Sequence, residues 1–323
     1  MKAAVIYENG GPEVLRYEEV ADPECPDGCV LVDVEAISIE GGDVYARVSS
    51  PPAHTPHVIG YMSAGTVVER GNGIASPAVG DRVVAFNTDG SHASKRAVPA
   101  MMTWPIPEGL DAATAACVPV AVGTAQECLF ETASLQRDQT ALIHAGAGGL
   151  GIAAIQLASE AGANVLATAS SDAKLTRLTE EFGLDHGINY ATESVPDRVR
   201  ELTGGHGADV ILDSVGGQTL IDSIEALAYR GSLISVGVAG RSGSNLAAIS
   251  LCGKNNTLHG FYLGSAMLAE HARVHPMIAG LLQRVADGDI RIAVDSTYPL
   301  SEAAAAHTYL ESRQAFGRVI LTP

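Results

Sequence analysis

The fold is decided by residues 140–151, which read Thr-Ala-Leu-Ile-His-Ala-Gly-Ala-Gly-Gly-Leu-Gly. The apolar run 140–144 predicts a short buried strand, and the apolar spacing over 152–158 predicts a helix after the glycines. A further apolar run, 164–168, predicts the next strand. This order of strand, glycine turn, helix and strand is the context in which a glycine motif binds a dinucleotide, whereas a glycine turn alone can be merely structural.

The glycines have the spacing G-x-G-x-x-G, with Gly146, Gly148 and Gly151 at the fixed positions. We expect Gly146 to permit a tight turn out of the strand and Gly148 to let the backbone approach a pyrophosphate. Gly151 is expected to let the helix pack closely on the sheet. Because the first N–H groups of a helix have no intrahelical partner, those around Gly149 and Leu150 are expected to face the anion.

Strands and helices alternate after residue 140, which predicts a parallel sheet with helices on both faces. The expected strands are 141–143, 164–168, 186–189, 208–213 and 231–237, and the expected helices are 149–161, 172–182 and 196–203. The first third of the chain predicts short strands between turn residues, at 3–7, 29–37, 65–70 and 82–86. An Ala-rich helical stretch over 111–132 is interrupted at Pro119 and Gly123, and the chain ends with strands near 297–298 and 318–321 around a helix over 301–311.

The composition argues against several classes of protein. The 323 residues are 46% hydrophobic and 18% charged, which is typical of a globular protein with two domains or one large one. A formal net charge of −17 argues against nucleic acid and anionic membranes as partners. We expect no signal peptide and no apolar run of the roughly 20 residues that a membrane helix needs. The 5 cysteines are dispersed, which fits a reducing cytoplasm.

The residues after the second strand of this alternating region bear on which nicotinamide dinucleotide binds. NAD enzymes place an acidic residue there for the ribose hydroxyls, and NADP enzymes accommodate the 2′-phosphate with small polar and basic groups. Ser170 and Ser171 follow the strand, and Lys174 lies at the start of the next helix. These residues favour NADPH, although Asp172, if its position shifted by two residues, could act as the ribose acid.

Several motifs, in order along nearly the whole chain, resemble one family. They are Met1-Lys2-Ala3, Gly11-Pro12-Glu13-Val14-Leu15, Val79-Gly80-Asp81-Arg82-Val83, Gly148-Gly149-Leu150-Gly151, Asp213-Ser214-Val215-Gly216-Gly217 and Gly317-Arg318-Val319-Ile320-Leu321. On these residues the chain resembles the medium-chain dehydrogenase/reductase superfamily, and most of all its zinc-free quinone oxidoreductase branch. The resemblance implies an α/β protein with a GroES-like β-barrel domain (1–118 and 264–323) and an inserted Rossmann domain with a doubly wound parallel sheet (119–263), with the cofactor in the cleft between them.

The resemblance also implies an activity. We expect an NADPH-dependent oxidoreductase that transfers hydride to a quinone or an α,β-unsaturated carbonyl without zinc. Two alternatives stay open: an enoyl reductase dedicated to one biosynthetic intermediate, and a weakly catalytic NADPH-binding protein. Relatives further imply a small-molecule substrate, a cytoplasmic location and a homodimer that pairs through the strand near 257–262.

Site residues follow from the same resemblance. It places Thr124 beside the nicotinamide carboxamide and Tyr190 on the 2′-phosphate. Further cofactor contacts are expected at Ser214, Val236, Gly237, Phe261 and Arg318. Tyr45 and Tyr61 are candidate catalytic donors to the substrate oxygen, or else apolar wall. Glu40, where the family usually has Asn, is either a proton relay or an ion-pair partner for Arg47.

No metal site is expected. Zinc-containing members have ligands near Ser38 and at the positions that Tyr61 and Met62 occupy here, and none of these three is a usual zinc ligand. His54 and His57 form an H-x2-H pair in a Pro-rich loop, without an acidic or thiol partner at ligand spacing. We therefore interpret them as loop histidines.

Overall fold

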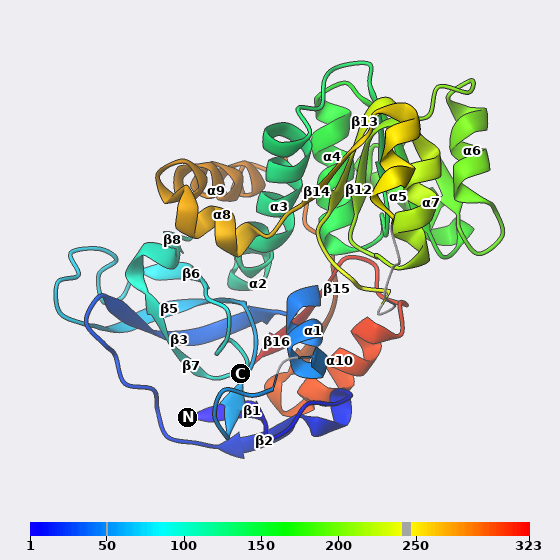
Figure 1. The fold of residues 1–323 in the computed structure, drawn as a ribbon. Helices are drawn as coiled ribbons and strands as arrows, with labels where there is room; N and C mark the ends of the chain where they lie inside the picture. The colour runs from blue at the N-terminus through cyan, green and yellow to red at the C-terminus, as the bar shows by residue number, and fades with distance from the viewer. Residues whose placement is uncertain (50, 241–246) are drawn as a thin grey trace. The chain divides into compact units, whose positions relative to one another are not determined.

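The computed structural model describes residues 1–49, 51–240 and 247–323, which form two compact units (Figure 1). The first unit combines Met1–Val120 with Gly264–Pro323, and the second is the inserted segment Ala121–Leu263. The resemblance placed these boundaries after residues 118 and 263, and the structure has them after residues 120 and 263.

The second unit is built on a parallel sheet of six strands in the order β11-β10-β9-β12-β13-β14. The strands are β9 (Thr140–Ile143), β10 (Asn164–Ala169), β11 (His186–Asn189), β12 (Ala208–Asp213), β13 (Leu227–Ser235) and β14 (Thr257–Gly260). The first strand lies in the middle, and later strands are added outward on one side and then on the other. This is the doubly wound order that the sequence predicts.

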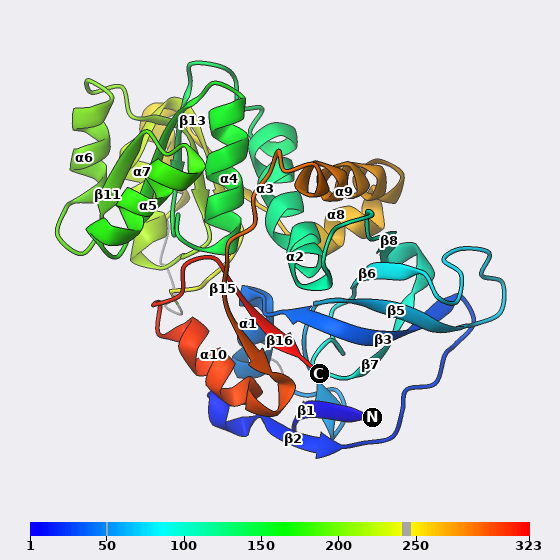
Figure 2. The same ribbon diagram turned by 180° about the vertical axis from the view of Figure 1, so that it is seen from behind.

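Helices cover both faces of this sheet (Figures 1 and 2). Helix α4 (Gly149–Glu160) packs beside α5 (Asp172–Phe182), and α6 (Val195–Leu202) packs beside α7 (Gln218–Ala226). Right-handed crossovers place the two pairs on opposite faces, because the chain reverses its direction of travel across the sheet after β11. The short helix α3 (Gly123–Gln126) precedes β9, and a 3-10 segment, Ala248–Lys254, precedes β14.

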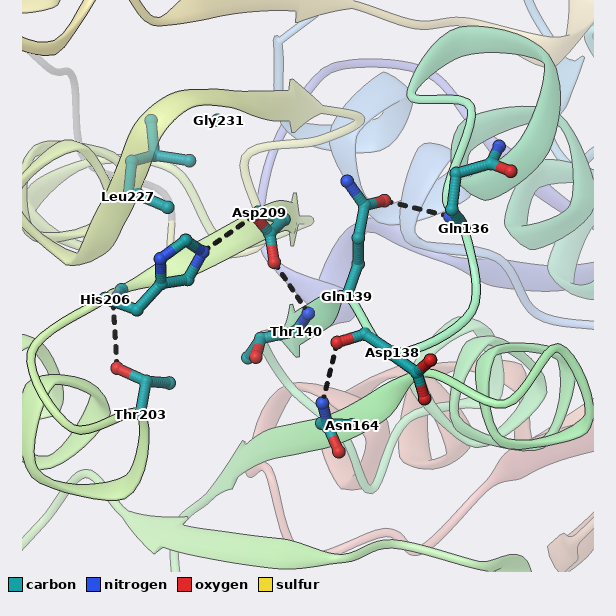
Figure 3. A network of polar contacts seen from close by, with 12 residues as sticks. Gln136, Asp138, Gln139, Thr140, Asn164, Thr203, His206, Asp209, Leu227 and Gly231 are labelled. Carbon is teal, nitrogen blue, oxygen red and sulfur yellow. Dashed lines mark hydrogen bonds and ion pairs between the residues drawn. The ribbon is translucent and has the colours of Figure 1, made fainter.

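Polar contacts brace the amino ends of the strands (Figure 3). Asp209 Oδ2 accepts the Thr140 N–H at 2.8 Å, and Asp209 Oδ1 lies 3.0 Å from His206 Nε2. On the neighbouring strand, Asn164 Nδ2 donates to the Asp138 carbonyl at 2.9 Å. These contacts join β12, β9 and β10 at one edge of the sheet. The carboxyl ends of the strands, at the opposite edge, are where open parallel sheets bind ligands.

The first unit contains a seven-stranded sheet and a small three-stranded sheet. The large sheet has the order β15-β16-β3-β5-β6-β8, with β7 also paired to β3, and the small one has the order β2-β1-β4. The strands are β1 (Lys2–Ile6), β2 (Arg16–Glu19), β3 (Cys29–Ser38), β4 (His57–Val58), β5 (Met62–Arg70), β6 (Arg82–Phe86), β7 (Lys95–Pro99), β8 (Thr103–Pro105), β15 (Val294–Pro299) and β16 (Arg318–Thr322). The helices are α1 (Gly41–Ser49), α2 (Ala112–Ala116), α9 (His271–Ala286) and α10 (Ala303–Glu311), with α8 (Leu263–Ala269) at the boundary.

The two ends of the chain share one hydrophobic core in this unit. Ile6 and Ile37 from the first part pack in the same buried cluster as Leu300 and Val319 from the last part. Strand β16 pairs antiparallel with β3 and parallel with β15. The last 60 or so residues therefore complete the first unit by burying apolar surface against it.

The helical stretch before β9 differs from its prediction in two respects. Pro119 lies in a π-helical turn, Val118–Val122, which runs on into α3, so the proline does not end the stretch. By length and composition, Ala112–Thr132 also passes as a membrane-spanning helix, so the expectation that no segment does so is wrong. Inside the protein, 72% of its apolar stretch of 18 residues is buried, as in the core helix of a globular protein. Four helices, α1, α7, α8 and α9, had no prediction; α1 begins with two glycines, and α9 contains Pro276.

Candidate functional site

The glycine turn between β9 and α4 is closely packed except at one position. A Cβ atom at Gly151 would lie 2.5 Å from the Ala145 carbonyl oxygen, so only glycine lets α4 pack on the turn. A Cβ atom at Gly146 would lie 2.8 Å from Ala167 Cβ, on the neighbouring strand. At Gly148, the residue before α4, a Cβ atom would meet only the Ala145 carbonyl, at 3.3 Å. In the described residues no other atom beyond the adjoining residues lies within 4 Å of that position, so the backbone at Gly148 is less closely packed than at Gly146 and Gly151.

The left-handed residue of this turn is Ala145, with φ of 51°, whereas Gly146, which was expected to permit the turn, does not have a positive φ. Its conformation is held from β10, because the Ala145 N–H donates to Thr168 Oγ1 at 3.2 Å and the Gly146 N–H donates to the Thr168 carbonyl at 2.8 Å. Below them, buried His144 bridges Thr168 (3.3 Å) and Ser223 (2.9 Å). Burial lowers the pKa of His144, which keeps the ring neutral. No local pattern in the sequence signals this support.

The predicted cofactor residues of the second unit converge at the carboxyl edge of the sheet. Each follows the end of one strand: Gly146, Gly148, Gly149 and Leu150 follow β9, Ser170, Ser171 and Lys174 follow β10, Tyr190 follows β11, Ser214 follows β12, Val236 and Gly237 follow β13, and Phe261 follows β14. Thr124 is the exception, since it lies in α3 and is buried. Because parallel strands end at a common edge, residues from six separate segments line one edge.

The ends of β10 and β11 form a polar corner. The Tyr190 N–H donates to the last carbonyl of β10 at 3.2 Å, so this tyrosine lies beside the loop that carries Ser170. Ser171 caps α5 by accepting the Lys174 N–H at 3.4 Å, and its own O–H remains a donor. Asp172 Oδ1 accepts Asn189 Nδ2 at 2.8 Å, which engages that carboxylate with β11.

The loop after β12 is shaped by a buried carboxylate. Asp213 Oδ1 accepts the N–H groups of Val215 at 2.7 Å and Gly216 at 3.0 Å. Gly216 and Gly217 both have positive φ, as such a turn requires. Asp213 thereby fixes the backbone of Ser214 at the edge of the sheet, a role that sequence reasoning missed.

Both candidate catalytic tyrosines lie in the first unit. Tyr45 is on α1 and is 55% exposed. Tyr61 is half-buried between β4 and β5, and its ring lies edge-to-face with Phe86 at a centroid distance of 5.9 Å. The Tyr61 ring also crosses the first turn of α1, where a Cβ atom at Gly42 would lie 2.3 Å from Tyr61 Cε2.

Glu40 pairs with Arg318, so the expectation of a pair with Arg47 is wrong. Arg318 Nη2 donates to Glu40, to Ser38 Oγ at 2.6 Å and to the Ile39 carbonyl at 2.8 Å. Burial opposes the charge, but Glu40 raises the pKa of Arg318, which keeps the guanidinium protonated. Strand pairing of β16 with β3 brings the two side chains together. A contact of Arg318 with the cofactor stays a prediction.

Arg47 ends a different buried chain of hydrogen bonds. Its Nη1 donates to His307 Nδ1 at 2.9 Å, His307 Nε2 lies 2.9 Å from His92 Nε2, and His92 Nδ1 lies 3.1 Å from Ser91 Oγ. An arginine can only donate, so neutral His307 carries its proton on Nε2 and donates it to His92. His92 then carries its proton on Nδ1. An extra proton on either ring would set two N–H groups against each other.

Acid should therefore destabilise the first unit. Burial lowers the pKa of His92 from 6.5 to about 3, and it also lowers the pKa of His307. As the pH falls from 6.5, the unfolded chain binds protons that the folded histidines do not, so the free energy of unfolding falls by up to ~1.4 kcal/mol per pH unit for each ring. Asp43 acts in the opposite sense between about pH 7 and pH 4, because burial raises its pKa to about 7.

Comparison with the variant His92→Gln isolates this contribution. We measure urea unfolding at neutral pH and at a pH two units below the ordinary histidine pKa. Between these two pH values, we expect the free energy of unfolding to fall by roughly 2–3 kcal/mol more in the wild type than in the variant. Equal losses in the two proteins would contradict the buried histidine chain.

Metal-ligating side chains do not gather in the described parts of the chain, where no group of three or more His, Cys, Asp or Glu residues could hold a metal ion. The His54 and His57 rings pack edge-to-face at a centroid distance of 5.1 Å. All 5 cysteines are free thiols.

Known proteins resemble this chain along its whole length. A family model described as the alcohol dehydrogenase GroES-like domain matches residues 26–134, and one described as zinc-binding dehydrogenase matches residues 149–280. The chain is 32% identical to a 2-haloacrylate reductase of Burkholderia sp over 331 residues, covering 99% of this chain and 98% of that protein. It is 34% identical to a quinone oxidoreductase of Pseudomonas aeruginosa, covering 97% of each. The structure of Escherichia coli quinone oxidoreductase complexed with NADPH matches with a TM-score of 0.94 and 29% identity over 100% of both chains. These likenesses confirm the predicted fold class of both units.

Proposed function

This chain belongs to the medium-chain dehydrogenase/reductase superfamily, in its quinone oxidoreductase branch, and from that premise we propose that it reduces a quinone or an α,β-unsaturated carbonyl with NADPH. The observation that carries this proposal is the carboxyl edge of the six-stranded sheet. There an open glycine turn and a polar corner fit the two phosphate-bearing parts of the dinucleotide. A relative that acts on 2-haloacrylate, a conjugated acid, supports the enone side of the substrate class.

The residues of the second unit fit NADPH better than NADH. Gly148 leaves space for the pyrophosphate, and the N–H groups that begin α4 have no acceptor within the helix. Ser170 and Lys174 supply a hydroxyl and a positive charge for the 2′-phosphate. Asp172, the residue that could favour NADH, is engaged by Asn189. When bound, NADPH supplies the hydride.

The first unit supplies the hydrogen-bond donor that stabilises the charge created by hydride transfer. Negative charge develops on the substrate oxygen, and a fixed donor aimed at that oxygen lowers the barrier. Tyr61 carries such a donor on a half-buried ring packed on α1 and Phe86. Tyr45 is the second candidate, and its greater exposure makes its O–H less fixed.

We propose that the reaction proceeds without zinc, although one matching family model is described as zinc-binding. At the expected ligand positions, Ser38 binds Arg318 and Met62 is buried in β5. Tyr61 holds the third position. This donor set does not fit a catalytic zinc, which needs three His, Cys or carboxylate ligands. Turnover that is insensitive to a chelator is the expected result.

Removal of the Lys174 charge tests the cofactor assignment. A charge-assisted hydrogen bond is worth roughly 1.5–3 kcal/mol, so Lys174→Ala should raise the KM for NADPH about 10- to 100-fold. The KM for NADH, which has no 2′-phosphate, should stay nearly unchanged. Steady-state kinetics with both cofactors measures the ratio. Equal effects on NADPH and NADH would remove Lys174 from the phosphate site.

A substrate screen with NADPH separates the remaining alternatives. Turnover of benzoquinone, phenanthrenequinone or a medium-chain enal supports the proposal. Turnover of large enones alone favours a dedicated enoyl reductase, and tight NADPH binding without turnover favours a weakly catalytic binding protein.

We also propose a cytoplasmic homodimer that pairs through β14. This strand lies at one end of the sheet and exposes Leu258. Light scattering measures the oligomeric state.

A further inference from the structure

Two buried charged side chains hold the main chain of Tyr61 from both sides. Asp43 is fully buried, and its Oδ1 accepts the Tyr61 N–H at 3.0 Å while its Oδ2 accepts the Glu40 N–H at 2.8 Å. Arg96 is 2% exposed, and its Nη1 donates to the Tyr61 carbonyl at 2.8 Å. The backbone N–H of Tyr61 is thus bonded to α1, and its carbonyl is bonded to β7.

Arg96 uses its donors almost entirely on main-chain carbonyls. Its guanidinium also reaches the carbonyls of Gly60 at 3.1 Å, Asn87 at 3.2 Å and Asp89 at 3.1 Å, and the hydroxyl of Ser63 at 3.2 Å. Across residues 1–49, 51–240 and 247–323, no carboxylate forms an ion pair with it. Its charge therefore serves to fix the backbone around Tyr61.

Such an arrangement costs stability. Burial lowers the pKa of Arg96 to about 10 and raises the pKa of Asp43 to about 7, since each charged form is taken out of water. Apolar residues of similar size at buried ion sites are often as stable or more so. The two charged side chains fix the backbone of Tyr61 in one position. The Tyr61 ring is then confined between Gly42 and Phe86.

We propose that Asp43 and Arg96 are positioning residues for Tyr61, which they hold as a rigid hydrogen-bond donor to the oxygen of the substrate. This inference rests on the proposed reductase function and names the group that completes its site. A donor displaced by about 1 Å loses up to about 100-fold in rate, so rigid placement has a direct kinetic value.

Asp43→Asn and Tyr61→Phe test this together. Asn has one acceptor oxygen, so one of the two N–H bonds is lost. We expect Asp43→Asn to lower kcat about 10- to 100-fold and to leave the KM for NADPH within about twofold. Tyr61→Phe should lower kcat about 100-fold or more. The double variant should be no slower than Tyr61→Phe, because Asp43 acts only through the hydroxyl.

Two further variants serve as controls for this interpretation. Asp81→Asn is the matched control, since Asp81 accepts the Ala78 N–H at 2.7 Å in an exposed turn of the same unit, and its kcat should stay unchanged. Gly42→Ala leaves Asp43 intact but displaces the ring, so it should lower kcat even if Asp43→Asn folds poorly. Additive losses in the double variant, or full activity in Tyr61→Phe, would overturn the proposal.

Amide hydrogen exchange separates failure of this inference from failure of the proposed function. In Asp43→Asn the Tyr61 amide should exchange faster than in the wild type, because its acceptor is weakened. Unchanged exchange overturns the role of Asp43. Wild-type protein that reduces neither quinones nor enones overturns the proposed function. Faster exchange in the variant would in that case still support the role of Asp43 in holding the Tyr61 backbone.

Discussion

Arg47→Met should destabilise the first unit by about 3 to 5 kcal/mol, which is a drop of roughly 10 °C in Tm. Arg47 is fully buried on α1, pairs with Glu311 at the end of α10, and donates to the Gly10 carbonyl at 3.1 Å and to His307 at 2.9 Å. Methionine fills similar volume without these bonds. It leaves a carboxylate whose side chain is only 13% exposed, together with a histidine chain that has lost its donor.

Urea unfolding followed by circular dichroism measures this loss. Arg200→Met is the control, because Arg200 pairs with Asp197 on the surface with side chains 47% and 72% exposed, and such pairs contribute about 0.5 kcal/mol or less. The double variant Arg47→Met with Glu311→Gln should recover part of the stability by removing a carboxylate that has lost its guanidinium partner. A double variant as unstable as the sum of the two single variants would contradict a stabilising Arg47–Glu311 pair.

Gly151→Ala should abolish useful NADPH binding, with Kd rising roughly 100-fold or more. The added Cβ atom would lie 2.5 Å from the Ala145 carbonyl oxygen and 2.6 Å from Gly146 Cα. These are backbone atoms, so α4 must move away from the turn and carry its first N–H groups out of place. Loss of two hydrogen bonds to a charged group corresponds to roughly 3 kcal/mol or more in affinity. Fluorescence titration of NADPH measures it.

Two other glycines make the result specific. Gly280→Ala, in α9, has no atom within 4 Å of the new Cβ and should leave NADPH binding unchanged while slightly stabilising the helix. Gly148→Ala has a contact only at 3.3 Å, so it should fold normally yet weaken NADPH binding through contact with the pyrophosphate. If Gly151→Ala bound NADPH as the wild type does, the turn would not be the phosphate site.

The second unit could be predicted closely because its signals are local. Three elements, 172–182, 186–189 and 208–213, have the predicted bounds. Apolar runs, caps and glycine spacing act over a few residues, and parallel strands then have one favoured order. The same reasoning placed Ser170 and Lys174 after the second strand of this unit, and the family resemblance added Tyr190. It did not identify Ala145 as the left-handed residue of the turn, because the bond from its N–H to Thr168 comes from the neighbouring strand.

The first unit shows what a sequence by itself leaves open. The motifs determined its family and its general fold, but the partners of its buried charged and polar side chains were decided by tertiary structure. Arg47 meets Glu311 across 264 residues, Arg318 meets Glu40 across 278, and His92 meets His307 across 215. A charged side chain takes whichever partner the packing of strands and helices brings within about 3 Å, and no local pattern records that choice. The same is true of Asp43 and Arg96, whose common target, Tyr61, became evident only when three separate segments folded together.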